Sequence, residues 1–385
     1  MPFEFATATR IVFGEGMERE VVPAAQSFAR HALLVTGRDQ GRSASLRAAL
    51  ETAGVACSGF VVDGEPTVEL VERGVQQARR EQSDLVIARG GGSAIDAGKA
   101  MAGLLTNPGA VLDYLEVVGA GKPLTQSAAP FIAIPTTAGT GSEVTRNAVL
   151  GVTERRVKVS LRSPFLLPRL AVVDPELTMG MPPEVTARTG LDALTQLIEA
   201  YVSIRANPLT DGFCFEGIRC VARSLRRAFD NGQNLSARRD MSLAALLSGL
   251  ALANAGLGVV HGIAGPLGGK FPAPHGAICA AILPHAVETN LRALRARGQA
   301  SSALGRYEHV GRLLTGRTTA TAEDGVAWVR DTCRAFGIPP LRAYGVSAAD
   351  IPVLVADAMK ASSTKGNPLP LTTGELEELL QGAMT

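Results

Sequence analysis

Short apolar runs and helical patterns alternate through the first half of the chain. The strand candidates are residues 5–13, 32–36, 55–62, 85–88, 130–134, 157–161 and 170–173. Helical patterns lie between several of them, at 46–53 and at 68–80, where Thr67 is suited to cap the helix. Strands that alternate with helices predict a mainly parallel sheet covered by helices on both faces.

The pattern changes after Pro182-Pro183. Apolar residues then recur at helical spacing, as at Leu191, Leu194 and Ile198, and Asn207-Pro208 is typical of a cap and a first helical turn. No strand pattern follows to the end of the chain. A length of 385 residues is also more than one core usually holds. We therefore predict two domains: residues 1–182, which are α/β, and residues 183–385, which are all-helical.

Composition narrows the classes of partner. Apolar residues make up 46% of the chain, charged residues 19% and aromatic residues 4%, and the formal charge is +2. This balance argues against a nucleic-acid or membrane-surface partner, because either needs a concentrated basic face. No charged residue occurs from 241 to 269, but polar residues and glycines interrupt this stretch, which favours a helix buried all round over a membrane span. Five scattered cysteines without a C-x-x-C pair indicate a reducing, cytoplasmic setting.

Two turns at predicted strand ends have the chemistry of a nucleotide site. Gly90-Gly91-Gly92-Ser93 lies between the 85–88 strand and a helical pattern, where backbone N–H groups and a helix N-terminus can meet a phosphate. A flexible turn is the alternative, because a glycine cluster alone is a weak signal. The second turn, residues 135–143, offers hydroxyls and glycine amides suited to ribose, pyrophosphate or nicotinamide, or it is an ordinary Ser/Thr turn.

Candidate metal ligands gather in the helical half. Asp192 and Gln196 are at i,i+4 on one face among apolar neighbours, and a buried carboxylate there needs a partner. A metal, a helix cap, an arginine or a backbone group would each serve. His261 and His275 could join the carboxylate in a Zn²⁺ or Fe²⁺ site, although either histidine alone suits a hydrogen-bonded core position. We interpret His31, His285 and His309 as structural.

Together these motifs resemble the iron-containing, group III alcohol dehydrogenases. The resemblance rests on the glycine turn with Asp96 and Lys99, the 135–143 turn, Asp174-Pro175, Asp192-Ala193-Leu194 and Pro274-His275-Gly276. It covers nearly the whole chain. It implies a Rossmann-like nucleotide domain followed by an all-helical domain, as in the dehydroquinate synthase-like fold, with metal and substrate in the cleft between them.

The resemblance also implies roles for individual residues, carried over by position. Gly91, Gly92 and Ser93 would hold the cofactor pyrophosphate, and the rest of the cofactor site would be Asp96, Thr136, Thr137, Thr140 and Lys158. Asp192, His261 and His275 would be catalytic through a bound metal. Gln196 takes a fourth metal position that is histidine in typical members. Gly265 stands where many members have a histidine near the nicotinamide that is often considered a proton relay.

The function implied is reversible hydride transfer between NAD or NADP and a small alcohol, giving an aldehyde or a ketone. Fe²⁺ or Zn²⁺ would act as a Lewis acid on the alcohol oxygen. Arg38 and Asp39 follow the 32–36 strand and favour use of both cofactors with a slight preference for NAD. No membrane or nucleic-acid partner is expected, and a homodimer is left open.

Two other functions share this fold. A metal- and NAD-dependent lyase like dehydroquinate synthase would need several basic side chains for a phosphorylated carboxylate, but Lys270 is the only Lys or Arg from 241 to 291. A nucleotide-binding homologue without activity is the second alternative, because Gln196 and Gly265 both alter the site.

Overall fold

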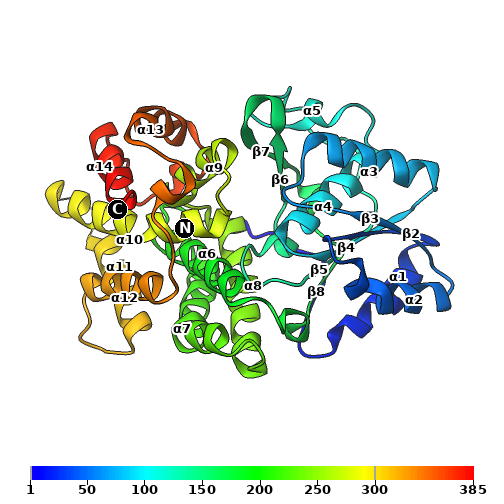
Figure 1. The fold of residues 1–385 in the computed structure, drawn as a ribbon, viewed down its shortest axis with the longest axis horizontal. Coiled ribbons are helices and arrows are strands. Elements are labelled where there is room, and N and C mark those ends of the chain that lie inside the picture. The colour runs from blue at the N-terminus through cyan, green and yellow to red at the C-terminus, as the bar shows by residue number, and fades with distance from the viewer. Residues whose placement is uncertain (1, 299–300) are drawn as a thin grey trace. The chain divides into compact units, whose positions relative to one another are not determined.

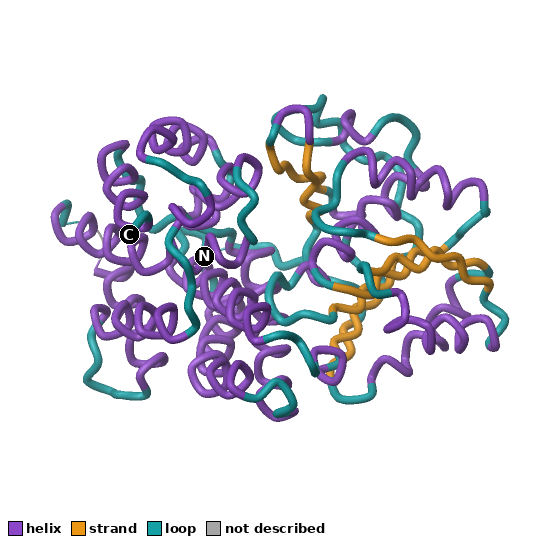
Figure 2. Tube along the Cα trace, viewed as in Figure 1, coloured by secondary structure: helices purple, strands orange, loops and turns teal. Residues whose placement is uncertain are grey.

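The structure is a computed structural model that describes residues 2–298 and 301–385. Two compact units divide the chain. The α/β unit comprises Ala6–Thr137 and Gly141–Met179, and the helical unit comprises Gly180–Thr385 together with Ala138–Thr140 and the N-terminal residues up to Phe5. Figure 2 shows the strands confined to the α/β unit among the described residues.

A six-stranded parallel sheet organises the α/β unit, in the order β1-β8-β5-β4-β2-β3 (Figure 1). Its strands are β1 (Ile11–Phe13), β2 (His31–Thr36), β3 (Ala56–Val61), β4 (Leu85–Gly90), β5 (Phe131–Pro135) and β8 (Leu170–Val173). The helices are α1 (Val21–Phe28), α2 (Ala44–Thr52), α3 (Val68–Arg80), α4 (Gly92–Thr106) and α5 (Val111–Tyr114). The predicted parallel sheet is confirmed.

Alternate residues of the central strands face two separate cores. Leu33 and Val35 of β2 pack with α3 and α4, whereas Ala32 and Leu34 pack with α1 and α2. Because side chains along a strand point to opposite faces, apolar residues at every position require helices on both sides. Figure 1 shows this arrangement, with α3 and α4 on one face and α1 and α2 on the other.

Two strand predictions were wrong in part. Of residues 5–13, only Ile11–Phe13 form a strand, β1. Residues 157–161 do form a strand, but this strand, β7 (Val157–Arg162), pairs antiparallel with β6 (Asn147–Val152) in a separate ribbon. The pattern Val-Lys-Val-Ser-Leu of this strand alternates apolar and polar residues, which is typical of a half-exposed antiparallel strand rather than of a buried parallel one.

The helical unit is built around one apolar core. Its helices are α6 (Pro183–Val202), α7 (Pro208–Asp230), α8 (Leu235–Ala255), α9 (Val259–Lys270), α10 (His275–Ala296), α11 (Ser301–Thr315), α12 (Ala322–Ala335), α13 (Ile351–Lys360) and α14 (Thr373–Ala383). Asn207 caps α7 with its side-chain oxygen, which accepts from the backbone N–H groups of Leu209 and Thr210. This confirms the predicted start of that helix.

The uncharged stretch 241–269 is two helices rather than the single helix that we predicted. Helices α8 and α9 meet at an angle of 101°. Gly256, at the break, has a φ of +73°, which an L side chain rarely adopts. Within the described residues no individual helix has the length and apolar character needed to cross a membrane; the bent α8–α9 pair has both only when its two members are counted together.

Candidate functional site

The glycine turn follows β4, beside the point at which the order of the strands in the sheet reverses. From β2 the chain proceeds to β3 on one side, and β4 and β5 follow on the other side. Ligands of open α/β sheets bind at the carboxyl ends of strands beside such a switch point. Gly91 caps α4 there, and it is half-buried together with Gly92 and Ser93. The first turn of α4 therefore offers its N–H groups at the expected position.

Part of the second turn lies beside the first. The N–H of Thr136 donates to the carbonyl of Gly90 over 2.9 Å. A Cβ placed on Gly91 would lie 3.4 Å from Cγ2 of Thr137, so the two turns are in direct contact within the α/β unit. Thr140 belongs to Ala138–Thr140, which is compact with the helical unit. Lys158, on β7, forms an ion pair with Glu65 at 3.0 Å.

A buried ionic cluster underlies the glycine turn. The Lys99 ammonium is fully buried and lies within hydrogen-bond distance of four oxygens: the carbonyl and hydroxyl of Ser142, the hydroxyl of Thr145 and the carbonyl of Asn147. Asp96 accepts hydrogen bonds from the Ser142 hydroxyl and from the N–H of Val149. Burial lowers the pKa of Lys99 to about 8 and raises the pKa of Glu143 to about 7.

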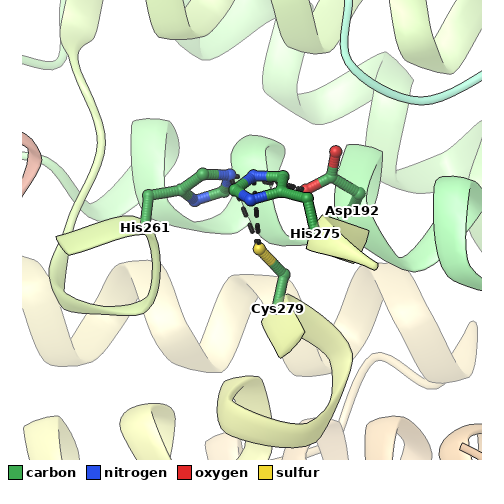
Figure 3. A group of neighbouring side chains, drawn as sticks. All are labelled: Asp192, His261, His275 and Cys279. Carbon is green, nitrogen blue, oxygen red and sulfur yellow. Dashed lines mark hydrogen bonds and ion pairs between the residues drawn. The ribbon is translucent and has the colours of Figure 1, made fainter. Parts of the chain in front are cut away.

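Four potential ligand atoms converge in the helical unit (Figure 3). Asp192 comes from α6, His261 from the first turn of α9, and His275 and Cys279 from the first two turns of α10. Their ligand atoms all lie within 4.8 Å of one another. Oδ1 of Asp192 is 3.4 Å from Nε2 of His261 and 3.8 Å from Nε2 of His275.

The two oxygens of Asp192 have different surroundings. Oδ2 accepts a hydrogen bond from the amide of Gln196 over 3.2 Å, and the amide oxygen of Gln196 accepts from the Ser248 hydroxyl over 2.7 Å. Oδ1 is buried and accepts no hydrogen bond, although it faces the other three ligand atoms. Burial would raise the pKa of Asp192, but His275 and His261 hold it below its usual range.

A buried carboxylate orients His261. Oε2 of Glu199 lies 2.6 Å from Nδ1 of His261, and Oε1 of Glu199 accepts from the N–H of Val260 over 2.6 Å. With the proton on Nδ1, the lone pair of Nε2 faces Asp192, which is the usual arrangement of a metal-binding histidine. Burial lowers the pKa of His261, but the neighbouring Cys279, Glu199 and Asp192 raise it well above its usual range overall.

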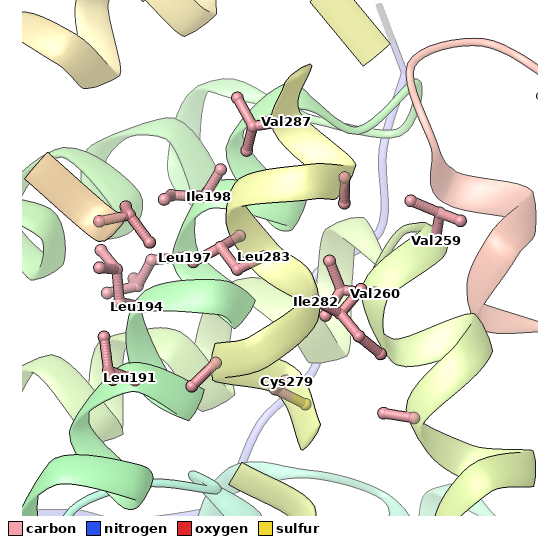
Figure 4. Packing of buried hydrophobic residues seen from close by; sticks show 14 of the residues in the cluster. Leu191, Leu194, Leu197, Ile198, Val259, Val260, Cys279, Ile282, Leu283 and Val287 are labelled. Atoms are coloured by element: carbon pink, nitrogen blue, oxygen red, sulfur yellow. The ribbon is translucent and has the colours of Figure 1, made fainter. Parts of the chain in front are cut away.

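Close helix packing brings the ligands together. A Cβ on Gly276 would lie 2.2 Å from the carbonyl oxygen of Arg188, so only glycine allows the start of α10 to lie against α6. Apolar side chains of α6 and α10, among them Leu194 and Leu283, belong to the same apolar core as Cys279 (Figure 4). His275 is the most exposed of the four, with 34% of its side chain accessible, whereas Asp192 is 3% accessible and His261 is 6% accessible. Ligands can therefore reach the cluster beside His275.

This donor set fits a divalent cation. Two imidazoles and a carboxylate are common Zn²⁺ and Fe²⁺ ligands, and a cation would satisfy the buried Oδ1 of Asp192. Cys279 and Glu199 were not predicted from the sequence. Their signals were spacing: Cys279 is at i+4 from His275, and Glu199 lies two turns after Asp192. His31 and His309 lie outside the cluster, beside Ser58 and Tyr201 respectively.

Known proteins match the chain along its length. The family descriptions "Iron-containing alcohol dehydrogenase" and "Fe-containing alcohol dehydrogenase family, C-terminal" match residues 8–175 and 186–384. The 1,3-propanediol dehydrogenase of Klebsiella pneumoniae is 40% identical over 322 residues, which are 83% of this chain and 81% of the relative. A solved 1,3-propanediol oxidoreductase has a TM-score of 0.92 at 35% identity and covers 100% of both chains. Sulfoacetaldehyde reductase from Bifidobacterium kashiwanohense, solved with NAD+, has a TM-score of 0.87 at 28% identity and covers 100% of this chain and 99% of its own.

Proposed function

Because this chain belongs to the iron-containing alcohol dehydrogenase family, we propose that it interconverts small alcohols and their aldehydes or ketones with a nicotinamide cofactor and a divalent cation. As a family member it is an oxidoreductase that acts on CH–OH groups. The observation that carries the metal proposal is the buried Oδ1 of Asp192, which faces His261 and His275 without a hydrogen bond.

Asp192, His261 and His275 would hold the cation, with Fe²⁺ favoured by the family and Zn²⁺ allowed by the donors. A cation bound there supplies Lewis acidity toward the oxygen of the alcohol or the carbonyl. Glu199 keeps the proton of His261 on Nδ1, and thereby keeps Nε2 available as a ligand. Gln196 fixes the second oxygen of Asp192, so that the first one stays directed into the cluster.

The glycine turn would bind the cofactor. Residues 91–93 offer backbone N–H groups at the start of α4 for the pyrophosphate, and Thr137 lies in contact with Gly91. Asp96, Thr136, Thr140 and Lys158 remain the other proposed cofactor residues. The nicotinamide carries the hydride, and the protein positions it.

We propose that NAD is preferred and NADP is tolerated. Asp39 accepts from the N–H of Gly41 and forms an ion pair with Arg42, so its carboxylate is fixed after β2, where it would oppose a 2′-phosphate. Arg38 forms an ion pair with Asp63, but this pair is well exposed. Arg38 can therefore exchange Asp63 for such a phosphate. A preference for either cofactor above about a thousandfold, or about 4 kcal/mol, would contradict this proposal. Five free thiols support a reducing, cytoplasmic setting.

The test is activity after metal removal and reloading. Chelator-treated protein should lose NAD-dependent oxidation of primary alcohols such as 1,3-propanediol and regain it with Fe²⁺ or Zn²⁺. His275→Ala should prevent both reloading and recovery, while His31→Ala, outside the cluster, should change neither. Full activity in metal-free protein, unaffected by His275→Ala, would exclude the metal from the reaction.

A further inference from the structure

We propose that Cys279 is a fourth, thiolate ligand of the cation, and that Gln196 is a positioning residue for Asp192 rather than a ligand. This inference rests on the proposed metal site and concerns which side chains of the chain complete it. It changes the expected donor set from one carboxylate, two imidazoles and an amide to one carboxylate, two imidazoles and a sulfur.

The amide of Gln196 is already engaged at both ends. Its nitrogen donates to Oδ2 of Asp192, and its oxygen accepts from Ser248, whose hydroxyl also lies 2.8 Å from the carbonyl of Ala245. Gln196 is only 3% exposed, so it has no solvent to exchange these partners with. The orientation places the amide nitrogen, which cannot bind a cation, toward Asp192 and directs the oxygen to Ser248.

Cys279, rather than Gln196, directs a free ligand atom at the two histidines. Its Sγ lies 3.8 Å from Nε2 of His261 and 3.7 Å from Nε2 of His275, and Figure 3 shows the sulfur directed at both rings. A tetrahedral site with Zn–N of about 2.05 Å and Zn–S of about 2.3 Å places nitrogen and sulfur about 3.6 Å apart, and nitrogen and oxygen about 3.3 Å apart. The sulfur–nitrogen separations of 3.7 and 3.8 Å and the 3.4 Å between His261 and Asp192 are close to these edges. The 3.8 Å between His275 and Asp192 is longer than the nitrogen–oxygen edge.

The backbone explains why this cysteine is in reach. His275 and Cys279 are one helical turn apart on α10, so both point to one face of that helix. Gly276 lets that face approach α6 and therefore Asp192. Cys279 is fully buried among apolar side chains of α6 and α10, where a thiolate needs a cation as partner.

Cys333 provides a matched control. It belongs to the same unit and also contacts α10, where its thiol donates to the carbonyl of Ala280 over 3.4 Å. It lies outside the group of converging ligand atoms. Replacing Cys333 with serine therefore removes a thiol near α10 while leaving the proposed ligands in place.

The experiment is cobalt substitution followed by absorption spectroscopy. Metal-free wild-type protein loaded with one Co²⁺ should show a near-ultraviolet sulfur-to-cobalt charge-transfer band. Cys333→Ser should keep the band and Cys279→Ser should lose it, with Co²⁺ affinity reduced at least about tenfold, since even loss of an outer partner costs about 10–100-fold. Gln196→Leu should keep the sulfur-to-cobalt band, while loss of the hydrogen bond to Asp192 shifts the visible cobalt bands.

A charge-transfer band that persists in Cys279→Ser, or one that is lost in Gln196→Leu, would overturn the assignment. X-ray absorption of the zinc-loaded wild type needs no variant: a sulfur neighbour at about 2.3 Å supports the assignment, and a shell of nitrogen and oxygen alone contradicts it. If the wild type binds one cation and oxidises alcohols without a sulfur signal, only this inference fails. If it binds no cation and remains active, the proposed metal function fails.

Discussion

Behind the glycine turn, the buried ammonium of Lys99 lies among four oxygens of its own unit, whereas in the helical unit the buried Asp192 keeps one oxygen without a hydrogen bond. Both regions remove charged side chains from water, which is costly unless the charges find partners. In the first region the chain supplies the cation itself. In the second, a carboxylate, two imidazoles and a thiol converge, and one carboxylate oxygen has no hydrogen-bond partner.

This difference separates a supporting cluster from a binding site. Lys99 binds Ser142, Thr145 and Asn147, and so joins these residues to α4, the helix that begins at the glycine turn. Asp192 is held by Gln196 at one oxygen only, which leaves the other for a ligand. A satisfied buried network gives rigidity, whereas converging donors with an unsatisfied atom indicate a ligand.

The largest expected effect tests whether each carboxyl of the cluster around Lys99 has a cationic partner. It holds two carboxyls, the partly buried Asp96 and the buried Glu143, but one lysine, and burial raises the pKa of Glu143 from 4.5 to about 7. Because the pKa of Glu143 is higher in the folded state than in the unfolded chain, the folded state is most stable where Glu143 is neutral, below about pH 4.5. This stability is lost as the pH rises through about 7. At about 1.4 kcal/mol for each pH unit between the two values, the loss is about 3 kcal/mol.

Thermal or urea unfolding at pH 4.5 to 7.5 measures this loss against Glu143→Gln, which cannot ionise. The free energy of unfolding of the wild type should fall relative to that of the variant across this range. Because Asp96 and Lys99 titrate in both proteins, their contributions largely cancel in the difference. Parallel pH profiles for the two proteins would mean that Glu143 finds a cation partner and that the cluster is complete.

The same contrast explains what the sequence could predict. The glycine turn acts through backbone groups of consecutive residues, so Gly90 to Ser93 and the strand before them identify it without knowledge of packing. Strands β2, β4, β5 and β8 were predictable for a similar reason, because strands buried on both faces are continuous apolar runs. The partner of β7 was not predicted, because no strand was recognised at residues 147–152.

The metal cluster depends on side-chain directions that only packing decides. Spacing places Gln196 and Asp192 on one helix face. Ser248, on α8, donates a hydrogen bond to the amide oxygen of Gln196 and so directs this oxygen away from Asp192. Cys279 becomes a neighbour of His261 only because Gly276 lets α10 lie against α6. Glu199 is recognised as a partner of His261 only after α6 and α9 meet.

The second expected effect concerns the orientation of His261. In Glu199→Gln an amide would replace the carboxylate that accepts from Nδ1, and its N–H₂ group favours a proton on Nε2, directed into the cluster. Affinity for Zn²⁺ should fall about 10–100-fold. Glu199→Asp is the control, because it keeps the acceptor and should retain more affinity than the glutamine variant. Equal affinity in wild type and Glu199→Gln, measured by competition with a chelating dye, would show that Glu199 does not fix the ring.

The third effect tests the glycine turn by placing a bulky side chain in it. Gly91 has φ −73° and ψ −177°, which any residue adopts, and its Cβ would meet Thr137 at an ordinary contact distance of 3.4 Å. Gly91→Val should therefore fold while its side chain obstructs the approach of a phosphate to α4. We expect NADH affinity, measured by fluorescence titration, to fall at least about tenfold, or about 1.4 kcal/mol. Zinc affinity should be unchanged, and unaltered NADH binding would remove the turn from the cofactor site.

The smallest effect concerns Gly265, one helical turn after His261 on α9 and therefore on the same face of that helix. No atom lies within 4 Å of the position that a Cβ would take, so Gly265→His should fold, and replacing a helical glycine should stabilise α9 by a few tenths of a kcal/mol. An imidazole there would occupy space beside His261, so relative rates should shift toward short alcohols. Gly265→Ala is the matched control, because it shares the gain in helix stability without the ring. If Gly265→His and Gly265→Ala oxidise a panel of short and long alcohols with the same relative rates as the wild type, the open space at Gly265 does not receive the substrate.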